Sequence, residues 1–411
     1  MFVSYEVSVL SSFPVAPFVE RPIHRRRRGD RRQHHLVSGH GNNHGLFQRR
    51  RDQWRHAELA YGGINLGSQA TGLIEDCYIH DVTSAIVGNS SRFVTMRRNH
   101  VKNFGETIFN SGTVILAEDS LYENQTAANS DALEIQGGPA GSIIRRCTFR
   151  HSSGVNSDAL DFNGTSGVLI ENCLVYDFTD KAVSMGASAA GGAPDRGIIV
   201  RNTLIYGVDT GVAVKDGSTC GLYNLTIAGC RLGYRLYQKF MTPVDGGHIT
   251  NSYNNILSGN TTNISLENSS SVAATYSDFN GTSWPGTGNI TSDPLFLSTA
   301  LHDYRLATGS PAARVGFLGQ DMGVILPVGA PMAPAVPQFE SVLRSDNGIS
   351  LLFWADSEKS YSLQYRDDVA AGTWLGLTNL GARPLPLLIS VVESTPTNAA
   401  RTYRLLTPQQ P

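Results

Sequence analysis

The sequence predicts an all-β protein whose main body is a parallel β-helix, a solenoid in which the strands of successive repeats stack in register. The first observation is the composition: only 17% of residues are charged, 42 are Gly, and blocks of helix-forming residues are nearly absent. The second is a short pattern of apolar and polar residues that returns about every 25 residues from Tyr61 onward. The third is that each repeat holds strands of period two and no crossover helix. Such strands bury their apolar faces only by stacking on copies of themselves.

Clear copies of the repeat place two short apolar strands around a polar pair. They are LIEDCYIHD from Leu73, IIRRCTFRH from Ile143, VLIENCLVY from Val168, IIVRNTLIY from Ile198 and GLYNLTIAG from Gly221. We place the polar residue that marks each repeat at Asp76, Arg98, Glu118, Arg146, Asn172, Asn202, Asn224 and Asn254. The cysteines show no metal-binding spacing, and Cys147 and Cys173 fall at equivalent positions, which predicts stacked, buried thiols. The repeats predict a solenoid over residues 61–326.

The first 60 residues differ from everything that follows. They carry 11 Arg against 5 acidic residues and 6 of the 11 His, so the rest of the chain is acidic. The basic run from His24 to Arg28 could bind nucleic acid or an anionic surface. Because the segment has no apolar periodicity, we interpret residues 1–60 as disordered, or as a mis-assigned start of the reading frame, and expect no nucleic-acid partner. It is also a poor secretory signal, since Pro14 and Pro17 interrupt its apolar stretch and a basic start is lacking.

Three segments follow the repeats. Turn-forming stretches such as NITSDPLFLS from Asn289 and HDYRLATGSPA from His302 are expected to close the solenoid. Residues 327–338 hold four prolines and predict a stiff linker. Residues 339–411 contain stretches of alternating apolar and polar residues, which predict a small β-sandwich. No run of 18 apolar residues exists, so we expect no membrane span.

Two nearly identical acidic stretches lie 27 residues apart, NSDALEIQG from Asn129 and NSDALDFNG from Asn156. In-register stacking would place Asp131 beside Asp158 and Glu134 beside Asp161, on one face of adjacent turns. Apolar residues alternate with Glu134 and Asp161, so these two acids should face solvent. Asp131 and Asp158 share that face only if the chain turns just after each of them, and we expect such a turn.

The four acids are candidate calcium ligands. Two carboxylates about 5 Å apart repel each other by about 3 kcal/mol at an effective dielectric constant of 20. Protonation, water or a hard divalent cation must relieve the repulsion among Asp131, Glu134, Asp158 and Asp161, and an oxygen-rich cluster suits Ca²⁺. The alternatives are an acidic ladder screened by solvent, or aspartates that serve as turn formers.

Two lysines follow the acids in the same register. Aligning VSMG from Val183 with LDFN from Leu160 places Lys181 in the column of Asp131 and Asp158. One turn further, Lys215 falls in the column of Gln136 and Asn163. The lysines are either structural partners of the acids or catalytic bases. Elimination from a uronate sugar needs a cation on the substrate carboxylate and a base that removes the adjacent proton, and a lysine can act only as the neutral amine.

The repeats between Tyr61 and Val324 resemble the right-handed parallel β-helix superfamily that includes pectate lyases and chondroitinase B-like enzymes. NSDALD is similar to the acidic motif of pectate lyases in polysaccharide lyase family nine. In that family, aspartates of consecutive turns hold calcium and a later lysine is the base. The resemblance implies Asp158 and Asp161 as ligands, with Glu134 added from the preceding turn. The family's lysine lies in the strand column that here holds Ser184, three residues after Lys181.

The C-terminal segments carry resemblances of their own. The closing stretches resemble the final turns of exported bacterial β-helix proteins, and residues 339–411 resemble the fibronectin-III-like or immunoglobulin-like modules of bacterial secreted enzymes. Both imply an extracellular or cell-surface location.

Together the residue patterns and these resemblances imply a monomeric, carbohydrate-active protein with a polysaccharide partner, and favour a calcium-dependent lyase of an acidic polysaccharide with Lys181 and Lys215 as catalytic candidates. A glycoside hydrolase and a non-catalytic surface or adhesion scaffold are the alternatives. Tyr206, Tyr234 and Tyr237 could line a sugar groove or stack in the core.

Overall fold

The computed structural model describes residues 3–10, 56–57, 63–240, 245–267, 269–330, 339–345, 348–355, 359–367, 373–383, 387–394 and 400–407. The chain forms two compact units. One comprises Asn42–Ala333, and the other joins Met1–Gly41 to Pro334–Pro411. Among the described residues, none of the helices has the length and hydrophobicity of a membrane-spanning segment.

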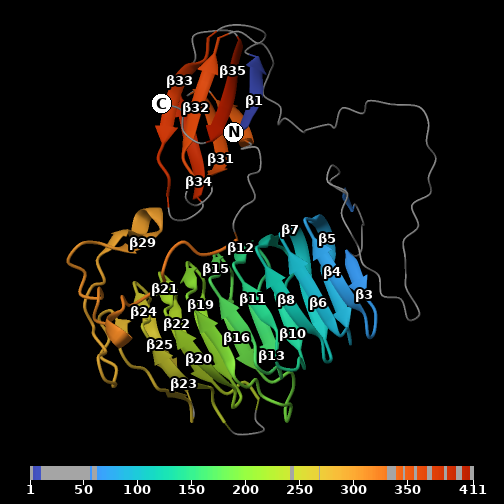
Figure 1. Ribbon diagram of the computed structural model, residues 1–411, viewed down its shortest axis with the longest axis vertical. Coiled ribbons are helices and arrows are strands. Elements are labelled where there is room, and N and C mark those ends of the chain that lie inside the picture. The colour runs from blue at the N-terminus through green and yellow to red at the C-terminus, as the bar shows by residue number, and fades with distance from the viewer. Residues whose placement is uncertain are drawn as a thin grey trace. The chain divides into compact units, whose positions relative to one another are not determined.

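The larger unit is an all-β solenoid of parallel strands, as predicted (Figure 1). Its nine-stranded sheet consists of β4 (Thr71–Glu75), β6 (Phe93–Arg97), β8 (Val114–Glu118), β11 (Ile143–Arg145), β14 (Leu169–Glu171), β17 (Ile198–Arg201), β20 (Thr219–Tyr223), β23 (His248–Tyr253) and β26 (Ser271–Val272). Neighbouring strands of this sheet belong to consecutive turns of the solenoid, so each strand represents one turn.

A 17-stranded sheet forms the rest of the solenoid wall. It begins with β2 (His56–Ala57), β3 (Ile64–Leu66), β5 (Tyr78–Asn89) and β7 (His100–Asn110). Beyond β7 it divides into two columns, because β7 pairs with both β9 and β10. The β9 column contains β9 (Leu121–Gln125), β12 (Thr148–Ser152), β15 (Leu174–Tyr176), β18 (Leu204–Tyr206), β21 (Thr226–Ala228), β24 (Ile256–Ser258) and β27 (Asp278–Phe279). The β10 column contains β10 (Leu133–Gln136), β13 (Leu160–Asn163), β16 (Lys181–Gly186), β19 (Thr210–Lys215), β22 (Leu232–Tyr237) and β25 (Thr262–Leu266).

A left-handed corner residue explains why a polar residue recurs in every repeat. After the strand of the nine-stranded sheet the chain turns through a residue of positive φ, at Asp76, Arg98, Asp119, Arg146, Asn172, Asn202, Asn224 and Asn254. Asn and Asp tolerate this conformation better than most residues. The predicted marker Glu118 is wrong by one residue, since Glu118 belongs to β8 and Asp119 makes the corner.

Alternating charges on the outer face of the nine-stranded sheet reinforce the register. One column reads Glu75, Arg97, Glu118, Arg145, Glu171 and Arg201. Arg97 pairs with Glu75 at 2.7 Å, Arg145 with Glu118 at 2.7 Å and Arg201 with Glu171 at 2.5 Å. Exposed pairs of this kind contribute at most about 1 kcal/mol each, so they select the alignment of neighbouring turns more than they stabilise the fold.

Inward-facing side chains of all three strand columns fill the solenoid. Ile144, Phe149 and Phe162 are fully buried in a single hydrophobic cluster that runs through the stack. Cys147 and Cys173 are free, fully buried thiols on neighbouring turns, as predicted.

The chain then crosses back over the solenoid. It passes through β28 (Phe296–Ser298), a 3-10 helix η1 (Thr299–Leu301), β29 (Asp303–Leu306) and a second 3-10 helix η2 (Phe317–Gly319). The backbone N–H groups of Val324 and Ala330 donate to the hydroxyls of Thr226 (3.0 Å) and Thr148 (2.9 Å), so residues 322–330 form a strap across the β9 column. Residues 327–330 of the predicted linker therefore belong to the solenoid, and residues 331–338 lie outside the described part.

The smaller unit contains two antiparallel sheets. One has the order β1 (Val3–Leu10), β35 (Ala400–Thr407), β32 (Tyr361–Arg366) and β33 (Leu375–Leu380), and the other β30 (Phe339–Ser345), β31 (Gly348–Ala355) and β34 (Leu387–Glu393). Phe353, Leu363 and Leu405 share one buried cluster. Of residues 1–60, expected to be disordered, Val3–Leu10 and His56–Ala57 are strands, and the others lie outside the described residues. The likeness to fibronectin-III or immunoglobulin modules stays a prediction.

Candidate functional site

The predicted site residues lie on consecutive strands of the β10 column. Glu134 on β10 pairs with Asp161 on β13, and Leu160 on β13 pairs with Val183 on β16, so both predicted alignments are confirmed. The chain bends at the residue after Asp131 and at the residue after Asp158, where the sequence required a turn. The side chains of Glu134 and Asp161 therefore point away from the core.

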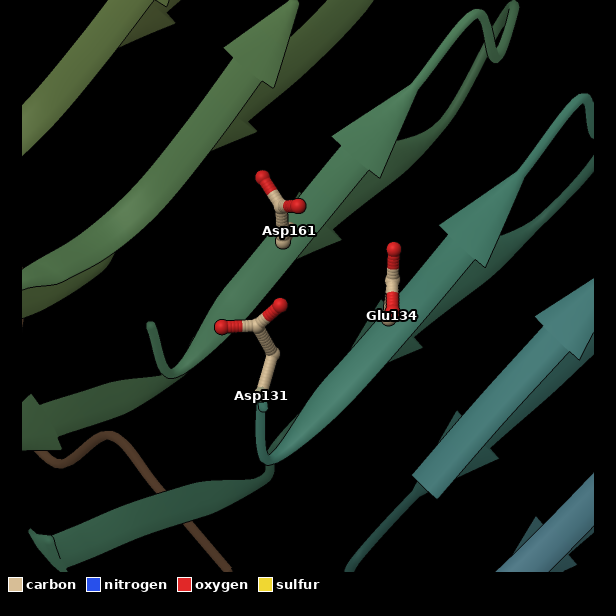
Figure 2. A group of neighbouring side chains, drawn as sticks. All are labelled: Asp131, Glu134 and Asp161. Atoms are coloured by element: carbon tan, nitrogen blue, oxygen red, sulfur yellow. The ribbon is translucent and has the colours of Figure 1, made fainter. Parts of the chain in front are cut away.

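Three carboxylates converge on this outer face (Figure 2). Asp131 stands at the corner before β10 and points toward Asp161, with Glu134 alongside, and an oxygen from each lies within 4.8 Å of the other two. Glu134 and Asp161 are each only 8% exposed, so the expectation that they face open solvent is wrong. Amide side chains lie against them: Gln136 donates to Glu134 at 2.5 Å, and Asn163 donates to Asp161 at 2.5 Å and to Glu134 at 3.1 Å.

Burial makes this cluster unfavourable when all three groups are charged. It raises the pKa of Asp131 to about 9, with repulsion from Asp161 and Asp158 adding to the effect. Burial also raises the pKa of Glu134. Oδ1 of Asp161 has no hydrogen-bond partner among the residues that the structure describes. The cluster therefore requires positive charge, from a proton or from a cation that oxygen ligands suit.

Asp158, the fourth predicted ligand, is engaged by Lys181. Its Oδ1 accepts the backbone N–H of Lys181 at 2.9 Å and the ammonium at 3.2 Å, and Lys181 also forms an ion pair with Asp180. Burial raises the pKa of Asp158 to about 6 despite this ion pair. Burial alone would lower the pKa of Lys181, but the attraction to Asp158 and Asp180 outweighs it, and the net shift is upward. Of the four predicted acids, three thus converge, while the Asp158 carboxylate pairs with Lys181 and the Asp158 backbone N–H donates to Oδ1 of Asp131 at 2.8 Å.

Lys215 provides the positive charge nearest to the three acids. Its chain lies over Gly186, where a Cβ atom would stand 2.7 Å from the Cε atom of Lys215. The ammonium donates to the Ser184 hydroxyl at 2.8 Å and lies 4.0 Å from Oδ1 of Asp161. Lys215 is 4% exposed, and its pKa is raised because the attraction to Asp161 outweighs burial. Lys215 lies in the column of Gly186, but its ammonium, and not that of Lys181, reaches Ser184 in the strand column where the resemblance expects the lysine.

Asp195 belongs to the site and was not predicted. It is fully buried and accepts the backbone N–H groups of Thr165 at 2.5 Å and Gly186 at 2.7 Å, which ties the end of β16 to the residues after β13. Burial raises its pKa to about 7. Asp195 follows a Gly- and Ala-rich insertion that interrupts the repeat, so no periodic pattern pointed to it.

One of the three candidate tyrosines lies beside the site. Tyr237 on β22 is the strand partner of Lys215, and the Arg235 guanidinium lies 4.2 Å from the centre of its ring. Tyr234 is fully buried in the core. Tyr206 lies in the β9 column, where its ring stacks on that of Tyr176 at 4.8 Å.

The comparisons with known proteins identify the solenoid. Residues 105–232 and 133–294 match the family model of the right handed beta helix region, and these ranges include every site residue named above. The solenoid is a right-handed parallel β-helix. A search of the curated proteins found no match.

Solved structures similar to this chain include two mutants of the tailspike protein of E. coli bacteriophage HK620. The mutant in complex with a hexasaccharide is 10% identical, with a TM-score of 0.21, covering 84% of this chain and 72% of the tailspike chain. The mutant in complex with a pentasaccharide is 9% identical, with a TM-score of 0.15, covering 85% and 73%.

Proposed function

We propose that this β-helix protein is a calcium-dependent polysaccharide lyase that cleaves an acidic, uronate-containing polysaccharide by β-elimination. The observation that supports this function is the group of Asp131, Glu134 and Asp161 with the Lys215 ammonium 4.0 Å from Asp161. Carboxylates and a lysine in one cluster are the groups that this reaction requires. We further propose a polysaccharide partner and an extracellular or cell-surface location.

The donor set suits calcium. Three carboxylate oxygens lie within 4.8 Å of one another, and Oδ1 of Asp161 is buried without a hydrogen bond from the described residues. Hard cations such as Ca²⁺ take oxygen ligands, and a cation would remove the repulsion that raises the pKa of Asp131. We assign Asp131, Glu134 and Asp161 as the protein ligands. Asp158 instead holds Lys181 in its charged form.

Lys215 is the base in this proposal. Bound calcium would neutralise the substrate carboxylate and acidify the proton on the adjacent carbon. Positive charge beside Asp161 would also cancel the attraction that raises the pKa of Lys215, so its neutral amine becomes accessible. Ser184 fixes the position of the Lys215 nitrogen through the 2.8 Å hydrogen bond. Lys181 keeps its proton because two carboxylates hold it.

The test measures unsaturated product. Purified protein is incubated with polygalacturonate, alginate and glycosaminoglycans, with calcium or with EDTA, and the ultraviolet absorbance of the new double bond is followed. We expect product from at least one polymer with calcium and none with EDTA. Lys215→Ala should lower kcat at least about 10³-fold, and Lys359→Ala, in the other unit, should not change it. If no polymer yields unsaturated ends, the lyase proposal fails.

A glycoside hydrolase is the second candidate, and the pKa of Asp131 favours it. At about 9, this pKa keeps Asp131 protonated at neutral pH beside the Asp161 carboxylate. Retaining glycosidases use two carboxyl groups about 5 Å apart, one of which is protonated and acts as the general acid. The same incubation separates the two functions, because a hydrolase releases saturated reducing ends and tolerates EDTA. Calcium binding without any product would instead favour a scaffold.

A further inference from the structure

A serine, a histidine and an aspartate form a hydrogen-bonded chain on the last two strands of the nine-stranded sheet. Ser271 on β26 is the Cα partner of His248 on β23. The Ser271 Oγ atom lies 2.9 Å from Nδ1 of His248, and Nε2 of the same ring lies 3.1 Å from Oδ1 of Asp245. A nucleophile within hydrogen-bond reach of a base, with a third group that orients the base, is the signature of nucleophilic catalysis. All three residues lie outside the carboxylate cluster described above.

The partners of His248 determine which ring nitrogen carries the proton. The hydrogen bond from Ser269 lowers the pKa of Asp245, so this carboxyl group is ionised at neutral pH. A carboxylate accepts hydrogen bonds and cannot donate them, so Nε2 of His248 carries the hydrogen and donates it to Asp245. Nδ1 of the neutral ring then accepts the hydrogen bond from the Ser271 hydroxyl. His248 is therefore oriented as a general base toward Ser271.

The turn that carries Asp245 and His248 is fixed by tight backbone packing. The two residues are separated only by Gly246 and Gly247, which are both buried. A Cβ atom at Gly246 would stand 2.0 Å from the nearest side-chain atom, and one at Gly247 would stand 2.1 Å from the carbonyl oxygen of Val214. Oδ1 of Asp245 also accepts the backbone N–H of Gly246 at 3.0 Å. The carboxylate and the imidazole are thus held in place by the backbone that connects them.

The edge of the sheet provides a backbone donor beside Ser271. Among the residues that the structure describes, β26 is the last strand of its sheet, so one of its edges is not paired with another strand. The N–H groups of Ser271 and Ala273 donate to carbonyl groups of β23, at 3.1 Å and 2.9 Å. Because successive N–H groups of a strand point to opposite sides, the N–H of Val272 points to the open edge, away from His248. The N–H of the residue after the nucleophile is an oxyanion donor in α/β-hydrolases.

We propose that Ser271 and His248 are the catalytic residues of a second site, which hydrolyses small acyl esters such as acetyl esters. Asp245 is the positioning residue of His248, and the N–H of Val272 donates to the oxyanion. Ser271 is exposed and the His248 side chain is 23% exposed, so an ester group that projects from a larger molecule can reach both. This activity does not depend on the proposed lyase function, because it uses neither the three carboxylates nor Lys215.

The proposed reaction balances within this group of residues. Nδ1 of His248 takes the hydroxyl proton while Oγ of Ser271 bonds to the ester carbonyl carbon, and the carbonyl electron pair moves to oxygen. The pair returns, the bond from carbon to the alcohol oxygen breaks, and that oxygen takes the proton from Nδ1. Water then attacks the acyl-serine in the same way and gives its proton to His248. The products are the alcohol, the carboxylic acid and the original hydroxyl of Ser271.

The first test is covalent labelling of the serine. A fluorophosphonate probe is incubated with the full-length protein, and the labelled residue is located by mass spectrometry. We expect one adduct, on Ser271, because a serine reacts readily only when a base activates it. Asp245→Asn should slow the labelling at least about tenfold, since the imidazole is no longer held in the required tautomer. Ser265→Ala, on β25, is the matched control and should label as the wild type does.

The second test measures hydrolysis of 4-nitrophenyl acetate in EDTA. We expect an initial burst of 4-nitrophenolate, and Ser271→Ala should lower kcat at least about 10²-fold. Asp245→Asn should lower kcat while KM stays within about threefold. Ser265→Ala should leave both constants unchanged, and circular dichroism checks that each variant is folded.

Two results would overturn the proposal. If the wild type is not labelled at Ser271, this serine is not activated. If Ser271→Ala hydrolyses the ester at the wild-type rate, the imidazole acts alone and Ser271 is not the nucleophile. Neither assay measures unsaturated product or requires calcium, so failure of this proposal is distinguishable from failure of the lyase proposal.

Discussion

The Lys215 ammonium donates a 2.8 Å hydrogen bond to the Ser184 hydroxyl, although the two residues belong to different turns and their side chains start from different positions along the strands. The contact is possible because Gly186 has no side chain, which leaves room for the aliphatic part of Lys215. A long side chain thereby delivers its charge to a neighbouring column. The position of a lysine in the alignment does not by itself locate its nitrogen.

Filling the space above Gly186 with a side chain should displace the ammonium nitrogen of Lys215. In Gly186→Ala the new Cβ atom would stand 2.7 Å from the Cε atom of Lys215, so the side chain must shift away from Ser184 and Asp161. We expect kcat of the proposed reaction to fall at least about tenfold. Gly376→Ala, where no atom lies within 4 Å of the added Cβ, is the control. Unchanged kcat in Gly186→Ala would contradict the role given to Lys215.

Calcium should stabilise the solenoid through the three carboxylates. A ligand at 100 times its Kd raises the free energy of unfolding by about 2.7 kcal/mol. We expect thermal unfolding to shift upward with calcium and back with EDTA. Asp161→Asn should abolish most of this shift, and Glu267→Gln, an exposed acid in the same unit, should retain it. A melting temperature that does not respond to calcium in the wild type would rule out the assigned ligands.

Without calcium, Asp131 should make the protein less stable as the pH rises. Its folded pKa of about 9 exceeds the ordinary value of 3.8, so between these values the folded state keeps a proton that the unfolded chain has lost. The stability contributed by this proton is complete below pH 4 and declines up to about pH 9, by at most about 1.4 kcal/mol per pH unit. Urea unfolding in EDTA at pH 5, 7 and 9 measures it. Asp131→Asn should show a weaker decline, and an identical slope in both proteins would refute this assignment.

Asp195 should matter for stability as well as for the site. Asp195→Ala leaves the buried N–H groups of Thr165 and Gly186 without their acceptor, which costs about 1–3 kcal/mol for each group. Urea unfolding should show the combined loss. Asp209→Ala, which breaks a surface ion pair with Arg231, is expected to cost less than about 1 kcal/mol. If the two variants lose the same free energy of unfolding, the hydrogen bonds of Asp195 do not contribute to stability as proposed.

The repeat predicted the stacking because backbone register follows directly from period and corner residues. Once 27 residues separate the two NSDAL segments, Glu134 must stand beside Asp161. What periodicity does not contain is the reach of long side chains and the contacts of insertions. Side-chain packing determines three features of the site. Lys181 forms an ion pair with Asp158, Lys215 extends over Gly186, and Asp195, which follows an insertion in the repeat, accepts the backbone N–H of Gly186. These features required the three-dimensional structure.

The strap over the β9 column changes how the solenoid can come apart. In a repeat protein each turn contacts only its neighbours, so the stack can fray from either end, one turn at a time. Here Ala330 is hydrogen-bonded to Thr148, 182 residues earlier in the chain, and Ile325 to Asn202. The final turns cannot peel away unless these bonds break too. Unfolding of the C-terminal turns is thereby coupled to unfolding of the middle turns, and we expect the two regions to unfold as one cooperative unit.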